Sequence, residues 1–323
     1  MRLKFALSAT LLALLASTTA LAQPSAAYPD RPVKVVVPFA PGGGGDIAAR
    51  VISEQLHRTL KVPVIIENRP GGNGIVGAGY LAKAPPDGYT IGYSTNTVHA
   101  GGLAVFKTMP FHPVDDFAPV ALTVSSPLVL AVKGENPAKT EAELRAWIQA
   151  NPKDASYSYH NGSSQTLGNL YMKRIQAAGL AVPYVSPVAA LTDVSGGVTA
   201  FGFYEPMAAK PLIDSQRVRP LVVSSHARLP MLPAVPTLVE VGLRDIEVRS
   251  WGGFFAPAGT PQPIIKALAE AVKGALEQPS VKAKLQGLGM TVEYLPDTKF
   301  RDFIAADSRQ WKAWYQEAGI QPQ

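Results

Sequence analysis

The chain has 323 residues, of which 47 % are hydrophobic, and it carries 30 Lys and Arg against 24 Asp and Glu with no cysteine. This composition predicts a globular protein of about two domains with a large core, and the lack of thiols excludes disulfides, thiolate metal sites and cysteine nucleophiles. The mild basic excess does not indicate a nucleic-acid-binding surface, so we expect no nucleic-acid partner.

The first residues have the layout of a cleaved secretory signal. Arg2 and Lys4 precede an apolar run over residues 5–16, and the small-residue triplet 20–22 follows. We therefore expect residues 1–22 to be a signal peptide and the mature chain to begin near Gln23. No later apolar run reaches the roughly 18 residues that a membrane helix needs, so we expect an exported protein without direct membrane insertion.

Strand, loop and helix alternate through the first third of the chain. A valine-rich strand is expected over residues 31–37, followed by the glycine run 42–45 and by an amphipathic helix that Asp46 is predicted to cap. The same order recurs with a strand over 62–67, glycines at 71–74 and a helix over 75–84, and a third strand over 89–95 ends in polar residues. This alternation favours a mostly parallel α/β sheet.

The middle of the chain continues with short strands and capped helices. Thr140 and Glu143 predict a capping box for a helix that ends at Ala150, and Ser186 followed by Pro187 predicts the start of a helix that ends at 196–197. Further strands are expected over 128–132, 156–159, 198–204 and 221–224, connections over 229–236 and 255–263, and helices over 260–278 and from Asp297 onward.

Two glycine motifs suggest phosphate or dinucleotide sites, and neither is complete. Residues 72–77 match G-x-G-x-x-G, but the following strand does not end in the acidic residue that would hold a ribose, so we predict a tight turn with close helix packing. Residues 42–45 lack the Gly-Lys-Ser/Thr of a P-loop. Four glycines after a strand do offer backbone N–H groups that suit a carboxylate, with a flexible turn as the alternative. We expect no cofactor.

Metal and hydrolase patterns are weak. The five histidines have no partner at i+3 or i+4 and no acidic cluster beside them, and no G-x-S-x-G elbow occurs. Ser163 and Ser164 near His160 could form a nucleophile and base, but their place at a helix start makes them better caps or donors to an anion. Aromatic side chains near strand ends could line a cleft if those ends face one another; they are Phe39, Tyr93, Tyr157, Tyr159, Tyr184 and Tyr204.

Several ordered motifs together resemble those of the Bug-type solute receptors of tripartite tricarboxylate transporters. The motifs lie at residues 38–46, 67–72, 86–90, 116–120 and 255–261. The resemblance implies an α/β type II periplasmic binding protein fold, with two lobes of mixed, mostly parallel sheets joined by two crossing strands. Residues 28–122 and 250–323 would form lobe 1 and residues 123–249 lobe 2. It also implies a monomeric, non-enzymatic periplasmic protein that binds a small organic carboxylate and serves a membrane permease.

The resemblance also implies which residues contact the ligand. Backbone N–H groups of the first βα loop and of a loop in the second lobe would hold a carboxylate, and polar side chains from other loops would add contacts. The implied residues are Phe39, Gly43, Gly44, Asp46, Ser94, Thr95, Ser163, Ser164, Thr166, Ala189, Ala190, Asp193 and Tyr204.

The chain departs from the family pattern in the second lobe. Val185 and Ser186 stand where the family usually has Lys-Gly, and residues 204–206 (Tyr-Glu-Pro) replace the common Phe-Asp-Asn. We therefore expect a ligand different from the commonest ones, with an aromatic acid or a dicarboxylate preferred over citrate. Two alternatives stay open: a sensor that presents its ligand to a signalling partner, and a serine-dependent hydrolase.

Overall fold

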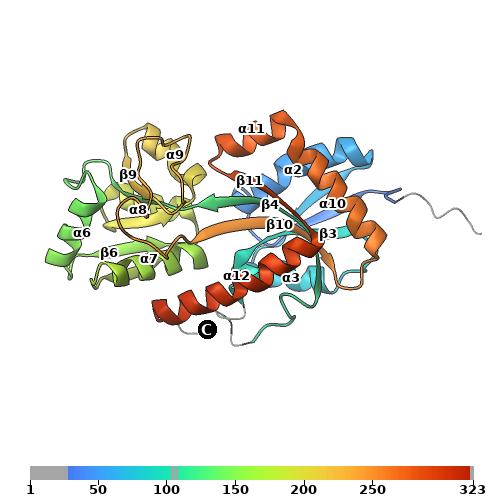
Figure 1. Cartoon of the computed structure of the whole chain (residues 1–323), viewed down its shortest axis with the longest axis horizontal. Helices are drawn as coiled ribbons and strands as arrows, with labels where there is room; N and C mark the ends of the chain where they lie inside the picture. The colour runs from blue at the N-terminus through green and yellow to red at the C-terminus, as the bar shows by residue number, and fades with distance from the viewer. Residues whose placement is uncertain (1–27, 103–105, 107, 321–323) are drawn as a thin grey trace, which may run out of the picture. The chain divides into compact units, whose positions relative to one another are not determined.

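Two β-sheets organise the chain from Arg31 onward, and this part forms one compact unit (Figure 1). The computed structural model describes residues 28–102, 106 and 108–320, so the expected signal peptide lies outside the described residues. Within this part of the chain, no helix combines the length and apolar character that a membrane span requires.

The first sheet has the strand order β11-β4-β10-β3-β1-β2. Its strand β1 (Val33–Val37), next to the edge strand, is buried at every position except Lys34 and pairs in parallel with β2 (Val64–Asn68) and β3 (Thr90–Thr95). The remaining strands pair antiparallel; they are β4 (Phe117–Pro127), β10 (Arg249–Pro257) and β11 (Thr291–Pro296). With the helices that cover it, this sheet is called the first lobe below.

The second sheet has the order β7-β6-β8-β5-β9 and, with its helices, forms the second lobe. Its strands are β5 (Val129–Lys133), β6 (Ser156–Tyr159), β7 (Leu180–Pro183), β8 (Phe201–Tyr204) and β9 (Val218–Val223). Parallel pairing joins β6 to β7 and β8, whereas β5 pairs antiparallel with β8 and β9. Both sheets are thus mixed, as expected. Parallel pairing was also expected to predominate, but it is confined to β1–β3 and β6–β8, because the strands at and beside the crossings pair antiparallel.

Helices cover both sheets, and the loops that precede several of them follow the carboxyl ends of parallel strands. They are α2 (Gly44–Leu60), the 3₁₀ turn η1 (Gly72–Gly74), α3 (Ile75–Ala82), α4 (Asn96–His99), α6 (Glu141–Ala150), α7 (Gly162–Arg174), α8 (Pro187–Gly196), α9 (Pro206–Asp214), α10 (Gln262–Glu277), α11 (Pro279–Gly287) and α12 (Asp297–Ala318).

Two crossings connect the lobes, which confirms the two-lobed fold. The chain passes from β4 through Leu128 into β5, and it returns to the first sheet along β10. Ser224 ties the crossings together, because its hydroxyl accepts from Leu128 N (2.8 Å) and donates to Val248 O (2.7 Å). The lobe boundary expected at residue 122 falls inside β4.

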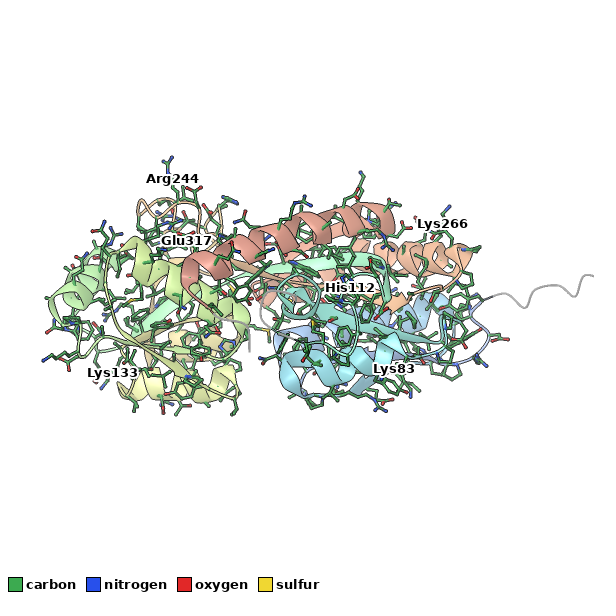
Figure 2. The ribbon with its side chains drawn as sticks, turned by 90° about the horizontal axis from the view of Figure 1, so that it is seen from below. Lys83, His112, Lys133, Arg244, Lys266 and Glu317 are labelled. Carbon is green, nitrogen blue, oxygen red and sulfur yellow. The ribbon has the colours of Figure 1, made fainter. Side chains whose placement is uncertain are left out.

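The C-terminal helix α12 contacts both lobes. Trp251 on β10 donates from Nε1 to Asp307 of α12 (2.6 Å), and near the end of the helix Asn169 of α7 donates to Ala318 O (3.0 Å). Arg174 of α7 also forms an ion pair with Glu317, which Figure 2 labels on α12. The segment expected to belong to lobe 1 alone therefore also packs on the second lobe.

Several local predictions are confirmed and others are wrong. Ser186 caps α8 as predicted. Half of the predicted capping box at α6 forms: the Thr140 hydroxyl accepts from Glu143 N (3.2 Å), but the Glu143 side chain accepts from Lys139 N (2.6 Å) instead of Thr140 N. Asp46 is not the cap of α2; Gly43 holds that position and Asp46 lies in the first turn. Residues 255–257, expected to be a connection, belong to β10, because a proline at the end of a strand needs no N–H for the ladder.

Gly77, the last glycine of the G-x-G-x-x-G match, brings α3 against neighbouring backbone. A Cβ on Gly77 would lie 2.7 Å from both Arg69 O and Pro38 Cα. Gly77→Ala is therefore expected to lower the free energy of unfolding by about 1 to 3 kcal/mol through overpacking. The matched control is Gly79→Ala on the same helix, where the nearest atom is Phe111 Cδ1 at 3.5 Å, so improved helix propensity leaves stability equal or higher. Urea unfolding of both variants tests this, and equal losses would contradict the packing role.

Candidate functional site

The first part of the candidate site is the start of α2, directly after β1. Gly42 has φ +85°, and Gly43 is the N-cap with φ −76° and ψ 164° and without a side-chain cap. The N–H groups of the first helical turn have no acceptor inside the helix, and the helix dipole places partial positive charge there. Because these positions are glycines, no side chain covers the amides, and this geometry suits a carboxylate.

Asp46 holds this loop in place with its own carboxylate. The side chain is almost fully buried and accepts from Gly42 N (2.9 Å), Arg50 Nε (2.9 Å) and Asn68 Nδ2 (2.8 Å). Burial by itself raises the pKa of Asp46, but the hydrogen bonds from Arg50, Gly42 and Asn68 outweigh it and lower the pKa. Asp46 is therefore an anion that shapes the loop, with its oxygens already engaged.

Phe39 and Thr95 lie against the same turn. A methyl group on Gly45 would be 3.6 Å from Thr95 Cγ2 and 3.7 Å from Phe39 Cδ2. The neighbouring Ser94 is buried, and its Oγ has no hydrogen-bond partner in the described part of the chain. Two predicted contacts, Phe39 just after β1 and Thr95 at the end of β3, thus lie against the first turn of α2 at one edge of the first sheet.

The second part of the candidate site is the loop from β6 into α7. Asn161 caps α7, since its Oδ1 accepts from Ser164 N (2.9 Å), and Ser164 Oγ accepts from the backbone N–H groups of His160 (3.0 Å) and Asn161 (3.2 Å). Ser164 therefore has a capping role. The helix leaves the first-turn amides of Gly162 and Ser163 without an intrahelical acceptor.

Glu205, at the end of β8, joins this loop to the start of α9. Its Oε2 lies 2.9 Å from His160 Nε2, and its Oε1 accepts from Asn161 Nδ2 (3.0 Å). Burial raises the pKa of Glu205. The charge of His160 in its protonated form, the hydrogen bond from His160 and that from Asn161 outweigh burial and lower the pKa to about 2. In the sequence, Glu205 stands out only as a departure from the family pattern. A single sequence gives no signal that Glu205 pairs with His160.

The predicted contacts on α8 have partners within the second lobe. Ala189 N donates to Ser186 Oγ (3.2 Å) and Ala190 N to Ser186 O (3.2 Å), so capping occupies both amides. The Tyr184 hydroxyl donates to Asp193 Oδ2 (2.6 Å), and burial together with this hydrogen bond raises the pKa of Tyr184 to about 12.

Direct contacts bring the two groups of loops together. Asn96 Nδ2 of the first lobe donates to Ser163 Oγ (3.0 Å), which also lies 3.3 Å from Ser250 Oγ on β10. A second contact between the lobes involves Gly44, because a methyl group on this residue would be 3.6 Å from Met207 Sδ at the start of α9. The starts of α2 and α9, and those of α4 and α7, therefore face each other between the lobes.

Three predicted contacts have hydroxyls that serve the protein itself. Ser164 caps α7, Thr166 Oγ1 donates to Gly162 O (2.7 Å), and the Tyr204 hydroxyl is hydrogen-bonded to Ser158. All three residues are fully buried. We do not carry them into the contact set proposed below.

The described residues give the hydrolase alternative no support. His160 pairs with Glu205, and no serine hydroxyl in the described ranges is hydrogen-bonded to its imidazole. No group of three or more His, Cys, Asp and Glu side chains suitable for a metal occurs among those residues either.

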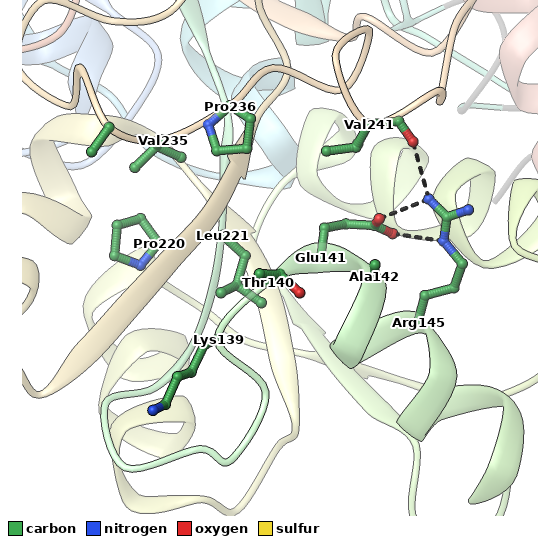
Figure 3. A pocket seen from close by; sticks show the side chains of 11 residues that line it. Lys139, Thr140, Glu141, Ala142, Arg145, Pro220, Leu221, Val235, Pro236 and Val241 are labelled. Atoms are coloured by element: carbon green, nitrogen blue, oxygen red, sulfur yellow. Dashed lines mark hydrogen bonds and ion pairs between the residues drawn. The ribbon is translucent and has the colours of Figure 1, made fainter.

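A surface pocket of about 690 Å³ lies elsewhere, in the second lobe between α6 and β9 (Figure 3). Its buried carboxylate, Glu141, is paired with Arg145 through two contacts (3.0 and 2.7 Å) and accepts from the Tyr171 hydroxyl (3.0 Å). Pro220, Leu221, Val235 and other apolar side chains form most of the remaining wall. Because the buried carboxylate of this pocket already has partners, we do not carry the pocket into the proposal below.

Two mixed α/β sheets, two crossings and opposed helix starts define a two-lobed binding protein. The chain matches the description "Tripartite tricarboxylate transporter family receptor" over residues 48–320, and it belongs to that family. It is 32 % identical to Protein BugT of Bordetella pertussis over 308 residues, which cover 94 % of each chain.

Solved structures agree in fold. The chain resembles a structure of an R. palustris protein with adipate (TM-score 0.87, 31 % identity, 92 % of this chain and 100 % of that chain). It also resembles MatC of Rhodopseudomonas palustris with bound malate (TM-score 0.80, 30 % identity, 89 % and 99 %) and the periplasmic binding protein BugD (TM-score 0.83, 29 % identity, 92 % and 100 %). The expected family and two-lobed fold are thus confirmed.

Proposed function

We propose that this chain is a non-enzymatic periplasmic receptor that captures a small organic carboxylate between its lobes and delivers it to the permease of a tripartite tricarboxylate-type transporter. The observation that carries the proposal is the uncovered glycine turn at the start of α2, which faces the second lobe. Neutral amides at a helix start hold an anion by hydrogen bonds directed at its charge, without a buried cation that would need a partner in the empty state.

The proposed contacts come from both lobes. In the first lobe they are the amides of Gly43, Gly44 and Asp46 with Phe39, Ser94 and Thr95; in the second they are Ser163 and Asp193. Adipate and malate in related structures support an aliphatic dicarboxylate as the ligand class. Closure of the lobes around such a ligand would be driven by its higher affinity for the closed form.

A thermal-shift screen with adipate, malate, citrate and benzoate tests the function. A ligand at 100 times its Kd adds about 2.7 kcal/mol to the free energy of unfolding, which corresponds to a rise in Tm of about 5 °C for a chain of this size. The uncharged diamide of adipic acid is the control and is expected to give no shift. No shift with any of the acids, or an equal shift with the diamide, would contradict carboxylate capture.

Gly44→Pro then locates the site. Proline is favoured at the first helical position, and the conformation of Gly43 is compatible with a following proline, so the variant removes one amide donor while α2 still forms. We expect a loss of affinity of about 10- to 100-fold, the value of a hydrogen bond to a charged group. Gly44→Ala, which keeps the amide, is the control; equal affinities of the two variants in calorimetry would move the site elsewhere.

A further inference from the structure

His160 has one ring nitrogen that the fold leaves without a partner. Its side chain is only 4 % exposed, and Nδ1 has no hydrogen-bond partner within the described residues. A buried polar atom in this state costs free energy unless a bound group satisfies it.

The partner of the other nitrogen fixes the tautomer. Glu205 is ionised and can only accept, so we assign a hydrogen to His160 Nε2, which donates it across 2.9 Å. Asn161 Nδ2 lies 3.1 Å from the same nitrogen, and in this assignment it donates to Glu205 Oε1 (3.0 Å) instead. Nδ1 is therefore an acceptor when the ring is neutral and a donor when it is an imidazolium. Only the charged form can bind a carboxylate through Nδ1.

The pair lies next to segments through which the two lobes contact each other. His160 directly precedes the cap of α7, whose Ser163 contacts Asn96 and Ser250 across the lobes. Glu205 caps α9, whose Met207 faces Gly44. The pair thus lies between two segments of the second lobe that each contact the first lobe.

We propose that His160 is a specificity-determining residue of this receptor: its Nδ1 donates to a second anionic group of the ligand, and binding is coupled to protonation of the ring. This inference rests on the proposed carboxylate-binding function and deepens it. A ligand held at one end by the α2 amides and at the other by an imidazolium would carry two acidic groups.

Two titratable side chains contact the His160 ring. Within the described chain, the recorded titratable groups in contact with His160 are Glu205 and Tyr204, whose ring stacks on the imidazole at 6.0 Å between centroids. The Tyr184–Asp193 pair is close enough to Tyr204 to raise its pKa. One carboxylate thus contacts the ring, and the phenols are neutral at ordinary pH, so the ring can take a positive charge when a second anion arrives.

Calorimetry of the full mature chain with the acid that gives the largest thermal shift among adipate, malate, citrate and benzoate tests the proposal at pH 6 and pH 9. The wild type is expected to bind about tenfold or more weakly at pH 9, with proton uptake seen as a dependence of the heat on buffer ionisation. His160→Gln is expected to lose about 10- to 100-fold in affinity at pH 6 and to bind equally at both pH values.

His57→Gln, at the opposite end of α2 from Gly44, is the matched control and should retain the wild-type pH dependence. Should His160→Gln misfold, ¹⁵N-histidine NMR of the wild type is used instead. We expect only Nε2 of His160 to carry a hydrogen without ligand, and both ring nitrogens to carry one in the complex. Tight binding by His160→Gln with the wild-type pH profile, or an Nδ1-protonated neutral ring, would overturn this inference alone. Failure of every acid to bind the wild type would instead overturn the proposed function.

Discussion

Asp46→Ala is expected to lower the free energy of unfolding by about 2 to 4 kcal/mol, because the buried carboxylate is the acceptor for several donors at once. Gly42 N and Asn68 Nδ2 would lose their partner inside the protein, whereas Arg50, whose side chain is about half exposed, could turn to solvent. The same change frees the glycine turn, so affinity for the carboxylate should fall by about tenfold or more through lost preorganisation. Urea unfolding and calorimetry measure the two effects.

The matched control for this change lies on the same helix. Glu54 pairs with Arg58 at i+4, as Asp46 pairs with Arg50, but its side chain is 58 % exposed against 3 % for Asp46. Glu54→Ala is expected to cost less than about 1 kcal/mol and to leave affinity unchanged. Asp46→Asn retains an acceptor oxygen for Gly42 N, so its loss of stability should lie between those of Asp46→Ala and Glu54→Ala. A wild-type stability for Asp46→Ala would show that the loop does not depend on its carboxylate.

Local patterns predicted the parts of the fold that depend on neighbouring residues. The capping pairs at Thr140 and Ser186 were identified because a cap and its helix lie within a few positions of each other. The valine-rich β1 was predictable because a mostly buried strand needs a run of apolar residues, here four valines interrupted only by Lys34. The glycine turn before α2 was also recognised from its own residues.

Contacts between segments far apart in the chain could not be predicted from a single sequence. The long antiparallel ladder between β4 and β10 joins segments more than a hundred positions apart, and the proline-rich residues 255–263, which include the end of β10, suggested a connection instead of a strand. Helix α9, which contains Pro211, was missed because proline inside a helix is normally unfavourable. The pairing of His160 with Glu205 depends on the parallel alignment of β6 and β8, which brings the ends of both strands to one edge.

Acidification is expected to remove roughly 3 kcal/mol of stability through Glu205 alone, taking about 1.4 kcal/mol for each pKa unit between its ordinary value of 4.5 and about 2 in the folded protein. The folded chain keeps this carboxyl ionised to about pH 2, whereas the unfolded chain binds a proton near pH 4.5. The stabilisation is therefore complete above pH 4.5 and is lost as the pH falls to about 2.

Glu205→Gln isolates this effect from other carboxyls, since Asp46 and Glu67 also have lowered pKa values and lose stabilisation on acidification. Denaturant unfolding at several pH values should place Glu205→Gln roughly 3 kcal/mol below the wild type at pH 6, with the gap closing towards pH 2. Glu135→Gln, at a side chain that is 86 % exposed, should follow the wild type throughout. A gap that stays constant with pH would mean that Glu205 stabilises the fold by shape and hydrogen bonding, and not as the anionic partner of His160.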